Sequence, residues 1–256
     1  MDNKKCITNE QEVRVTFAQE NKPYDHRIWH GITPAHYVQI ASRNAHLRLN
    51  VKAAEDEHIF VFDMDQCIYH CDDLVKFDRK SALNHFIKLT KMTESDFDKY
   101  ESYNDNWMEM FVEKFSEKRN EICCVIDSSD YRTFLSKCNE VNAKLDGLKF
   151  RKFLFTNGTK CRTQNILNLI GLEHAFEKVF CADIDEHEHI IKPKKPAFEF
   201  VQNHLQAAPK MIHFFDDNPK NIKGARELGW NVYEVKNNLL NQIETAIDSV
   251  GGNQTE

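Results

Sequence analysis

Two short apolar runs in this sequence each end in a pair of acidic residues. The runs and their acids are His58–Phe62 with Asp63 and Asp65, and Met211–Phe215 with Asp216 and Asp217. Such runs predict buried strands of a parallel sheet, whose carboxyl ends are where α/β sheets place ligand sites. At an effective dielectric of ~20, carboxylates ~4 Å apart repel by about 4 kcal/mol. Oxygen-coordinated Mg²⁺ would relieve that repulsion, so the pattern predicts a magnesium site.

Strand-like and helix-like segments alternate from the second strand onward. The predicted strands are 58–62, 152–156, 179–182, 211–215 and 231–235. Helices are predicted over about 160–170, from Pro196, from Pro219 to just before Gly229, and over 239–250. Strands that alternate with helices indicate a doubly wound parallel α/β sheet.

A long helical insertion is predicted between the first two of these strands. They are separated by roughly 85 residues, whereas a crossover connection needs only about a dozen. The stretch from Cys67 to Asp146 contains no glycine, and its apolar residues recur at helical spacing around 83–87 and 107–115. We therefore predict a core domain of residues 58–66 and 147–250, with a helical cap domain of residues 67–146 inserted into it.

Residues 1–57 form an N-terminal extension whose role the sequence leaves open. Residues 13–17 alternate as in a strand. Thr33 and Pro34 predict the start of a helix, with threonine as the N-cap and proline at the first helical position. Apolar residues then follow at helical spacing: Tyr37, Ile40, Ala41 and Leu47. The extension could pack on the core, cover the site or form an oligomer contact, and the oligomeric state stays open.

Composition narrows the class of partner. The 256 residues carry a formal net charge of −6 and a pI of about 6.1, which argues against binding a nucleic-acid polymer. The sequence has no apolar stretch near the ~20 residues of a membrane span, and its start lacks the apolar core of a signal peptide. None of the eight cysteines forms Cys-x-x-Cys. We expect reduced thiols and a cytoplasmic protein.

Two further segments bring chemistry to the same predicted sheet edge. The strand at 152–156 ends in Thr156 and is followed by Asn157, and Lys192 lies in the loop before the strand at 211–215. A metal ion and a lysine can neutralise a phosphoryl group, while a hydroxyl and backbone N–H groups bind its oxygens. A carboxylate can then act as the nucleophile. The set predicts a phosphoryl-transfer site.

These residues resemble the motifs of the haloacid dehalogenase-like phosphohydrolases. The matching segments, in chain order, are Asp63-Met64-Asp65, Phe155-Thr156-Asn157-Gly158, Lys192-Pro193 with Phe198, and Phe215-Asp216-Asp217 with Asn221-Ile222. Within that family the chain is most similar to the pyrimidine 5′-nucleotidase-like branch. The similarity rests on the segment Asp63-Met64-Asp65-Gln66-Cys67-Ile68-Tyr69 and on Ile126-Asp127 with Tyr131. The 57 residues before the first motif are more than that branch usually has.

The resemblance implies a role for each site residue. Asp63 would be the nucleophile, and Asp65 would protonate the leaving oxygen and then activate water. Thr156, Asn157 and Lys192 would bind the phosphate. Mg²⁺ would be held by these groups: the Asp63 carboxylate, the Asp65 main-chain oxygen, Asp216 and Asp217.

The implied activity is a Mg²⁺-dependent phosphomonoesterase acting through an aspartyl-phosphate. Its substrate would be a small phosphorylated metabolite, with a pyrimidine nucleoside 5′-monophosphate as one candidate. A second carboxylate at Asp65 favours phosphate esters, because a dehalogenase needs no acid for its leaving group.

Other interpretations stay open at this point. The chain could be a catalytically weak or inactive protein of the same fold that binds phosphate or another protein. A phosphorelay receiver shares the sheet and the acids but lacks a large insertion after the first strand. Residues 185–189, Asp-Glu-His-Glu-His, could suggest a metal site, although contiguous ligands rarely close one, and a solvated loop is the simpler interpretation.

Overall fold

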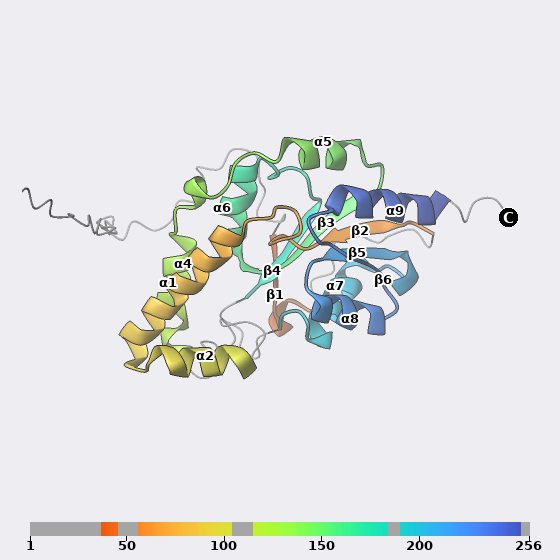
Figure 1. Ribbon diagram of the computed structural model, residues 1–256. Helices are drawn as coiled ribbons and strands as arrows, with labels where there is room; N and C mark the ends of the chain where they lie inside the picture. The colour runs from red at the N-terminus through yellow and green to blue at the C-terminus, as the bar shows by residue number, and fades with distance from the viewer. Residues whose placement is uncertain (1–36, 46–55, 104–114, 184–189, 252–256) are drawn as a thin grey trace, which may run out of the picture. The chain divides into compact units, whose positions relative to one another are not determined.

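One sheet contains every strand that the structure describes. The computed structural model describes residues 37–45, 56–103, 115–183 and 190–251, all within the larger of the chain's two units, Thr33–Glu256. The strands are β1 (Tyr37–Ile40), β2 (Ile59–Phe62), β3 (Arg151–Thr159), β4 (Lys178–Ala182), β5 (Ile212–Asp216) and β6 (Asn231–Glu234). All neighbouring pairs are parallel, in the order β1-β4-β3-β2-β5-β6 (Figure 1). The predicted doubly wound parallel sheet is confirmed.

The strand order explains where a site can form. β2 lies between β3 and β5, and the chain crosses from one side of β2 to the other when it passes from β4 to β5. Connections on the two sides of β2 therefore leave in opposite directions. A doubly wound sheet binds its ligand in the crevice that this reversal opens at the carboxyl ends of the strands.

Helices cover both faces of the sheet. They are α1 (Asp72–Thr90), α2 (Glu94–Tyr103), α4 (Arg119–Asp127), α5 (Asn139–Gly147), α6 (Lys160–Ile170), α7 (Lys195–Leu205), α8 (Pro219–Glu227) and α9 (Leu239–Gly251). On one face, Phe198 of α7 and Ile222 of α8 pack with Val61 and Phe214 in a buried core. Figure 1 shows α6 and α9 on the side of the sheet away from α7 and α8.

Local sequence signals set the helix ends near the site. α6 begins where the Thr159 side chain accepts a hydrogen bond from the backbone N–H of Arg162, and it ends at Gly171 with φ +75°. α8 begins at Pro219 after Asn218, whose side chain accepts from the backbone N–H of Lys220. The predicted boundaries of both helices are thus confirmed to within a residue or two.

In the described part of the segment between β2 and β3, helices are joined by turns and loops. α1, α2, α4 and α5 lie in this part of the chain, and α1, α2 and α4 share a small apolar core. Phe86, Phe97 and Ile126 are buried in that core, and Phe115 packs against it. The predicted helical residues 107–114 lie outside the described part of the chain. The assignment of residues 67–146 as a separate cap domain stays a prediction.

The predicted helix after Thr33 is wrong where the structure describes it. Residues 37–40 form β1, which pairs with β4 from Tyr37 opposite Val179 to Ile40 opposite Ala182. Ile40, which belongs to the predicted helical stripe, instead alternates with Val38, and the pleat places both on one face, in the core with α7. β1 therefore completes an edge of the core sheet, although it belongs to the segment predicted as an extension. The predicted strand at 13–17 lies outside the described residues.

The structure bears on two features expected from the composition, the lack of a membrane span and the reduced state of the cysteines. Across the described residues, no helix is both long enough and apolar enough to span a bilayer. Cys67, Cys71, Cys138 and Cys181 carry free thiols. Cys67 and Cys181 are buried as packing residues.

Candidate active site at the carboxyl edge of the sheet

Lys192 draws the ends of β2 and β5 together. Its ammonium donates to Asp63 Oδ1 at 2.5 Å, to Asp216 Oδ2 at 2.7 Å and to the carbonyl oxygen of Phe155 at 2.7 Å. All three donor positions of the ammonium are therefore used, and the side chain is almost completely buried. We call Asp63, Lys192 and Asp216 the Lys192 cluster.

Backbone and amide contacts fix each member of the Lys192 cluster. The backbone N–H of Asp63 donates to the Phe215 carbonyl at 2.8 Å. Asp216 Oδ1 accepts from the backbone N–H of Asn218 and from the Asn221 side chain, both at 2.9 Å. The cluster is thus held by the ends of two adjacent strands and the first turn of α8.

The side chain of Asn157 locks the loop that carries Lys192. Its Nδ2 donates to the Lys192 carbonyl at 2.8 Å, and its Oδ1 accepts from the Lys192 backbone N–H at 2.9 Å. This reciprocal pair engages both polar atoms of the side chain. Asn157 therefore contributes to the site partly by positioning Lys192.

Thr156 points its hydroxyl into the same buried edge. Its Oγ1 accepts from the backbone N–H of Gly158 at 3.0 Å, and the residue is fully buried. The hydroxyl proton is not used in that bond and can be donated to an anion. A Cβ on Gly158 would lie 3.3 Å from Thr156 Oγ1 and 3.1 Å from Thr163 Oγ1, so a larger residue here would have to displace these side chains by a few tenths of an ångström.

Negative charge exceeds positive charge at the Lys192 cluster. Burial raises the pKa of Asp63 well above its ordinary value, Lys192 opposes that shift, and Asp216 adds to it. Burial disfavours the charged form of Lys192, but Asp216 and Asp63 outweigh it and raise the pKa. Burial and then Asp216 raise the pKa of Asp217 to about 6. One lysine does not balance three carboxylates.

The surplus carboxylates have the composition of a divalent cation site. Asp63, Asp216 and Asp217 each offer an oxygen, and these oxygens lie within 4.8 Å of one another. Carboxylate oxygens are the preferred ligands of hard cations such as Mg²⁺. A divalent ion would also relieve the repulsion from Asp216, which adds to the effect of burial in raising the pKa values of Asp63 and Asp217. The residues present therefore fit such an ion.

A second charged cluster surrounds Asp65. Arg162 of α6 donates from Nη1 to Asp65 Oδ2 and from Nη2 to Asp65 Oδ1, both at 2.8 Å. The same Nη2 also donates to Asp78 Oδ2 of α1 at 3.0 Å. Burial raises the pKa of Asp65, but Arg162 and a hydrogen bond from the Tyr69 hydroxyl outweigh it, so that the net pKa is lowered. We call Asp65, Arg162 and Asp78 the Arg162 cluster.

Sequence reasoning missed Arg162 and Asp78, although both carry a detectable signal. Arg162 lies on the buried stripe of α6 with Ile166 and Ile170. Asp78 lies on the buried stripe of α1 together with Leu74. A charged residue at a core position of an amphipathic helix needs a partner. Nothing in the sequence shows that the two helices share one.

The residues that suggested a nucleotidase hold the helical segment in place. Tyr131 is buried, and its hydroxyl donates to the Ile126 carbonyl at 2.8 Å. The Asp127 carboxylate accepts a hydrogen bond from Thr159, and its carbonyl accepts one from Asn165 at 3.0 Å. The Asp127 contacts bind α4 to β3 and α6.

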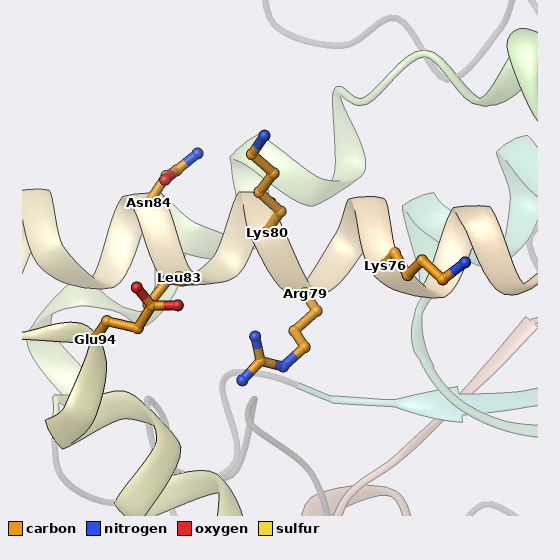
Figure 2. A pocket seen from close by; sticks show the side chains of 6 residues that line it. All are labelled: Lys76, Arg79, Lys80, Leu83, Asn84 and Glu94. Atoms are coloured by element: carbon orange, nitrogen blue, oxygen red, sulfur yellow. The ribbon is translucent and has the colours of Figure 1, made fainter.

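An open pocket along α1 is distinct from the Lys192 cluster (Figure 2). Its lining residues are Lys76, Arg79, Lys80, Leu83, Asn84 and Glu94. Arg79 pairs with Asp98 at 2.7 Å and Glu101 at 2.8 Å, and Lys76 pairs with Asp73 at 3.0 Å. Figure 2 shows Arg79 and Lys80 extending from opposite sides of α1. The charged residues of the pocket thus form ion pairs within α1 and between α1 and α2. None of the predicted site residues lines the pocket.

The alternative metal cluster cannot be compared with the structure, because residues 185–189 lie outside its described part. The large insertion that a phosphorelay receiver would lack is present between β2 and β3. That observation counts against the receiver interpretation.

A comparison with protein families gives one match over most of the chain. The family model described as haloacid dehalogenase-like hydrolase matches residues 20–229. The matched range spans β1 to α8 and so includes both charged clusters.

Several solved structures resemble this fold. A HAD family enzyme, bt-2542 from Bacteroides thetaiotaomicron in a magnesium complex, is 19% identical with a TM-score of 0.48, over 71% of this chain and 94% of that one. The haloacid dehalogenase-like family protein SP0104 from Streptococcus pneumoniae is 14% identical with a TM-score of 0.45, over 74% and 92%. The L-2-haloacid dehalogenase from Xanthobacter autotrophicus, with chloropropionic acid covalently bound, is 16% identical with a TM-score of 0.44, over 70% and 77%.

Proposed function

Because this chain belongs to the haloacid dehalogenase-like hydrolase family, we propose that it hydrolyses small phosphate monoesters with Asp63 as the nucleophile. The observation that carries the proposal is the Lys192 cluster, where Lys192 Nζ lies 2.5 Å from Asp63 Oδ1 and 2.7 Å from Asp216 Oδ2. An ammonium at this point neutralises a phosphoryl group and orients the attacking carboxylate.

In the first step, an oxygen of Asp63 forms a bond to phosphorus while the bond from phosphorus to the leaving oxygen breaks. Because the net pKa of Asp65 is lowered, Asp65 must take up a proton before this step; it then gives that proton to the leaving oxygen, so the alcohol departs neutral. In the second step, water attacks the phosphorus of the aspartyl-phosphate and loses a proton to Asp65. Inorganic phosphate leaves, and the Asp63 carboxylate is restored.

The remaining site residues bind the charge of the phosphoryl group. The Thr156 hydroxyl and the Asn157 backbone N–H would donate to phosphate oxygens. Lys192 would keep its hydrogen bond to Asp63 and exchange one of its other two for a phosphate oxygen. Asp63, the Asp65 main-chain oxygen, Asp216 and Asp217 would hold Mg²⁺. When bound, the ion would neutralise charge on the phosphoryl oxygens.

Asp65 favours phosphatase activity over dehalogenation within this family. A halide leaves without a proton, whereas an alkoxide leaving group needs one. The two hydrogen bonds from Arg162 and the one from Tyr69 hold the Asp65 carboxylate in a defined orientation next to Asp63. We therefore propose a cytoplasmic phosphomonoesterase whose helical segment, residues 67–146, acts as a cap.

A substrate panel with Mg²⁺ tests the proposal. It contains p-nitrophenyl phosphate, UMP and other mononucleotides, sugar phosphates and glycerol phosphate. We expect release of inorganic phosphate from at least one ester, and reversible loss of that activity when EDTA removes the metal. A nucleoside 5′-monophosphate is one candidate because the chain resembles the nucleotidase-like branch at residues 63–69.

The variant Asp63→Asn separates a catalytic site from a phosphate-binding module. It should abolish turnover, and acid-quenched wild-type protein incubated with ³²P-labelled ester should carry acid-stable label that the variant lacks. Asp56→Asn is a matched control, because Asp56 is an exposed carboxylate just before β2. Full activity in the Asp63 variant would refute the assigned nucleophile, and inactivity of the wild type on the whole panel would favour the binding-module alternative.

A further inference from the structure

Arg162 is the only charged side chain that the described residues place in hydrogen-bond contact with Asp65. Its guanidinium meets both carboxylate oxygens at 2.8 Å, in the planar fork geometry that fixes a carboxylate most strongly. The Arg162 side chain is only 10% exposed. A group so constrained transmits its own position directly to Asp65.

Asp78 gives the guanidinium a second place to bind. Its Oδ2 accepts from the same Nη2 that contacts Asp65, and its Oδ1 is buried without a hydrogen-bond partner. Tyr131 closes the other side, with the Arg162 guanidinium 5.7 Å from its ring centroid. One guanidinium thus serves two carboxylates, one at the end of β2 and one on α1.

Proton transfer at Asp65 uses a carboxylate oxygen that Arg162 also contacts. A rotation of the carboxylate that turns an oxygen toward a leaving group would loosen one of the two hydrogen bonds from Arg162. The unpartnered Oδ1 of Asp78 can accept the N–H that becomes free, so that the guanidinium does not lose a buried hydrogen bond. Removing either anchor should therefore disturb the orientation of Asp65 rather than the Lys192 cluster.

We propose that Arg162 is a positioning residue that orients Asp65 for proton transfer to the leaving group, and that Asp78 of α1 holds Arg162 during that transfer. The inference rests on the proposed function and adds to it a residue pair outside the matched motifs. Because Asp78 lies on α1, the orientation of the acid depends on how the helical segment packs against α6.

Leaving-group dependence tests this role. An alkyl phosphate such as glycerol phosphate needs a proton on its leaving oxygen, whereas p-nitrophenolate is a good leaving group without one. For Arg162→Lys, which keeps the charge but loses the fork, we expect kcat/KM for the alkyl ester to fall about 10²-fold. For p-nitrophenyl phosphate it should fall less than about 5-fold. Asp78→Asn should shift the ratio of the two values in the same direction, by about 10-fold.

The ratio of the two kcat/KM values does not depend on how much of a variant is folded, so it stays informative if Arg162→Lys is unstable. Arg151→Lys is the matched control, because Arg151 forms a similar fork on Glu177, at 2.8 and 2.5 Å, and lies at the start of β3. Its ratio should equal that of the wild type.

A double variant and a crystal structure complete the test. In an Asp65→Asn background, Arg162→Lys should cause no further loss on the alkyl ester. A crystal structure of Arg162→Lys should show a displaced Asp65 carboxylate with the Lys192 cluster unchanged. Equal losses on both esters, no loss on either, or a multiplicative loss in the double variant would overturn the inference. Wild-type protein that hydrolyses neither ester, nor any other of the panel, would instead overturn the proposed function, and this inference with it.

Discussion

The two charged clusters at the carboxyl edge have the same arrangement of charges, but different elements of the fold hold them in place. Each holds one buried cation between two carboxylates. The Lys192 cluster is fixed by strand ends, through backbone contacts of Asp63 and Asp216. The Arg162 cluster joins β2, α6 and α1, and leaves Asp78 Oδ1 without a partner. The proposed nucleophile is therefore held by the sheet, while the proposed acid also depends on the helical insertion.

The largest effect should come from removing the cation of the sheet-held cluster. Lys192→Met leaves Asp63 and Asp216 buried without their shared partner, which should cost about 3–5 kcal/mol of unfolding free energy. Turnover should fall about 10²–10³-fold for all esters alike. Chemical denaturation and steady-state kinetics measure the two effects.

Lys195→Met serves as the control for that change. The Lys195 side chain is 69% exposed and pairs with Glu199 at the surface. Its loss should change stability by less than about 0.5 kcal/mol. A Lys192 variant as stable as this control would show that the buried ammonium is not needed to hold the strand ends.

Removing one carboxylate from each cluster should lower the free energy of unfolding by unequal amounts. Asp216→Asn weakens hydrogen bonds to Lys192, Asn218 and Asn221, and should cost about 2–3 kcal/mol. Burial raises the pKa of Asp78, so its ionised form is already disfavoured in the folded protein. Asp78→Asn should therefore cost less than about 1 kcal/mol. Urea unfolding at pH 7 compares them, and equal losses would contradict the asymmetry between the clusters.

A group of uncharged side chains near the amino ends of β2 and β5 should make the stability of the protein depend on pH. His213 contacts His58 at 2.8 Å and the Tyr233 hydroxyl at 2.9 Å, and burial followed by His58 lowers its pKa to about 4. The unfolded chain therefore binds a proton below the ordinary histidine pKa of 6.5 that the folded protein does not bind. Stability should fall by about 2–3 kcal/mol as the pH drops from about 6.5 to about 4.

The variant His213→Phe isolates that contribution. Phenylalanine can take the place of the ring beside Phe60 and Tyr233, but it does not titrate. Thermal unfolding between pH 4 and 7 should show a flatter profile for the variant than for the wild type. A profile with unchanged slope would assign the acid sensitivity to other groups, with Asp56 near His58 the first to examine.

A moderate effect should come from a glycine that supports the Lys192 loop. A Cβ on Gly224 would lie 2.9 Å from Phe198 Cε2 and 3.0 Å from the Pro193 carbonyl. Gly224→Ala should therefore cost about 1–2 kcal/mol and lower kcat by shifting the loop. Gly147→Ala, at the end of α5, has nothing within 4 Å and should be neutral or stabilising. Equal stability of the two variants would show that the loop adapts.

Sequence patterns alone predict the parallel sheet, its strands from β2 to β6, and the placement of the motif residues near the carboxyl ends of those strands. These follow from short-range patterns: apolar runs of strand length, glycine stops and N-cap residues act within a few positions of one another. The segment after Thr33 was predicted to be a helix but forms strand β1. Its apolar spacing fits both a helical and a strand period, and pairing with β4 favours the strand.

The contact of Arg162 with both Asp65 and Asp78 depends on tertiary packing and is not visible in the sequence. The three residues are separated by up to 97 positions, and each lies on a different element. A pattern along one helix can show that a charge is buried, but not which partner compensates it. The partner depends on how α1 and α6 pack, and that packing reflects the summed contacts of the whole helical segment.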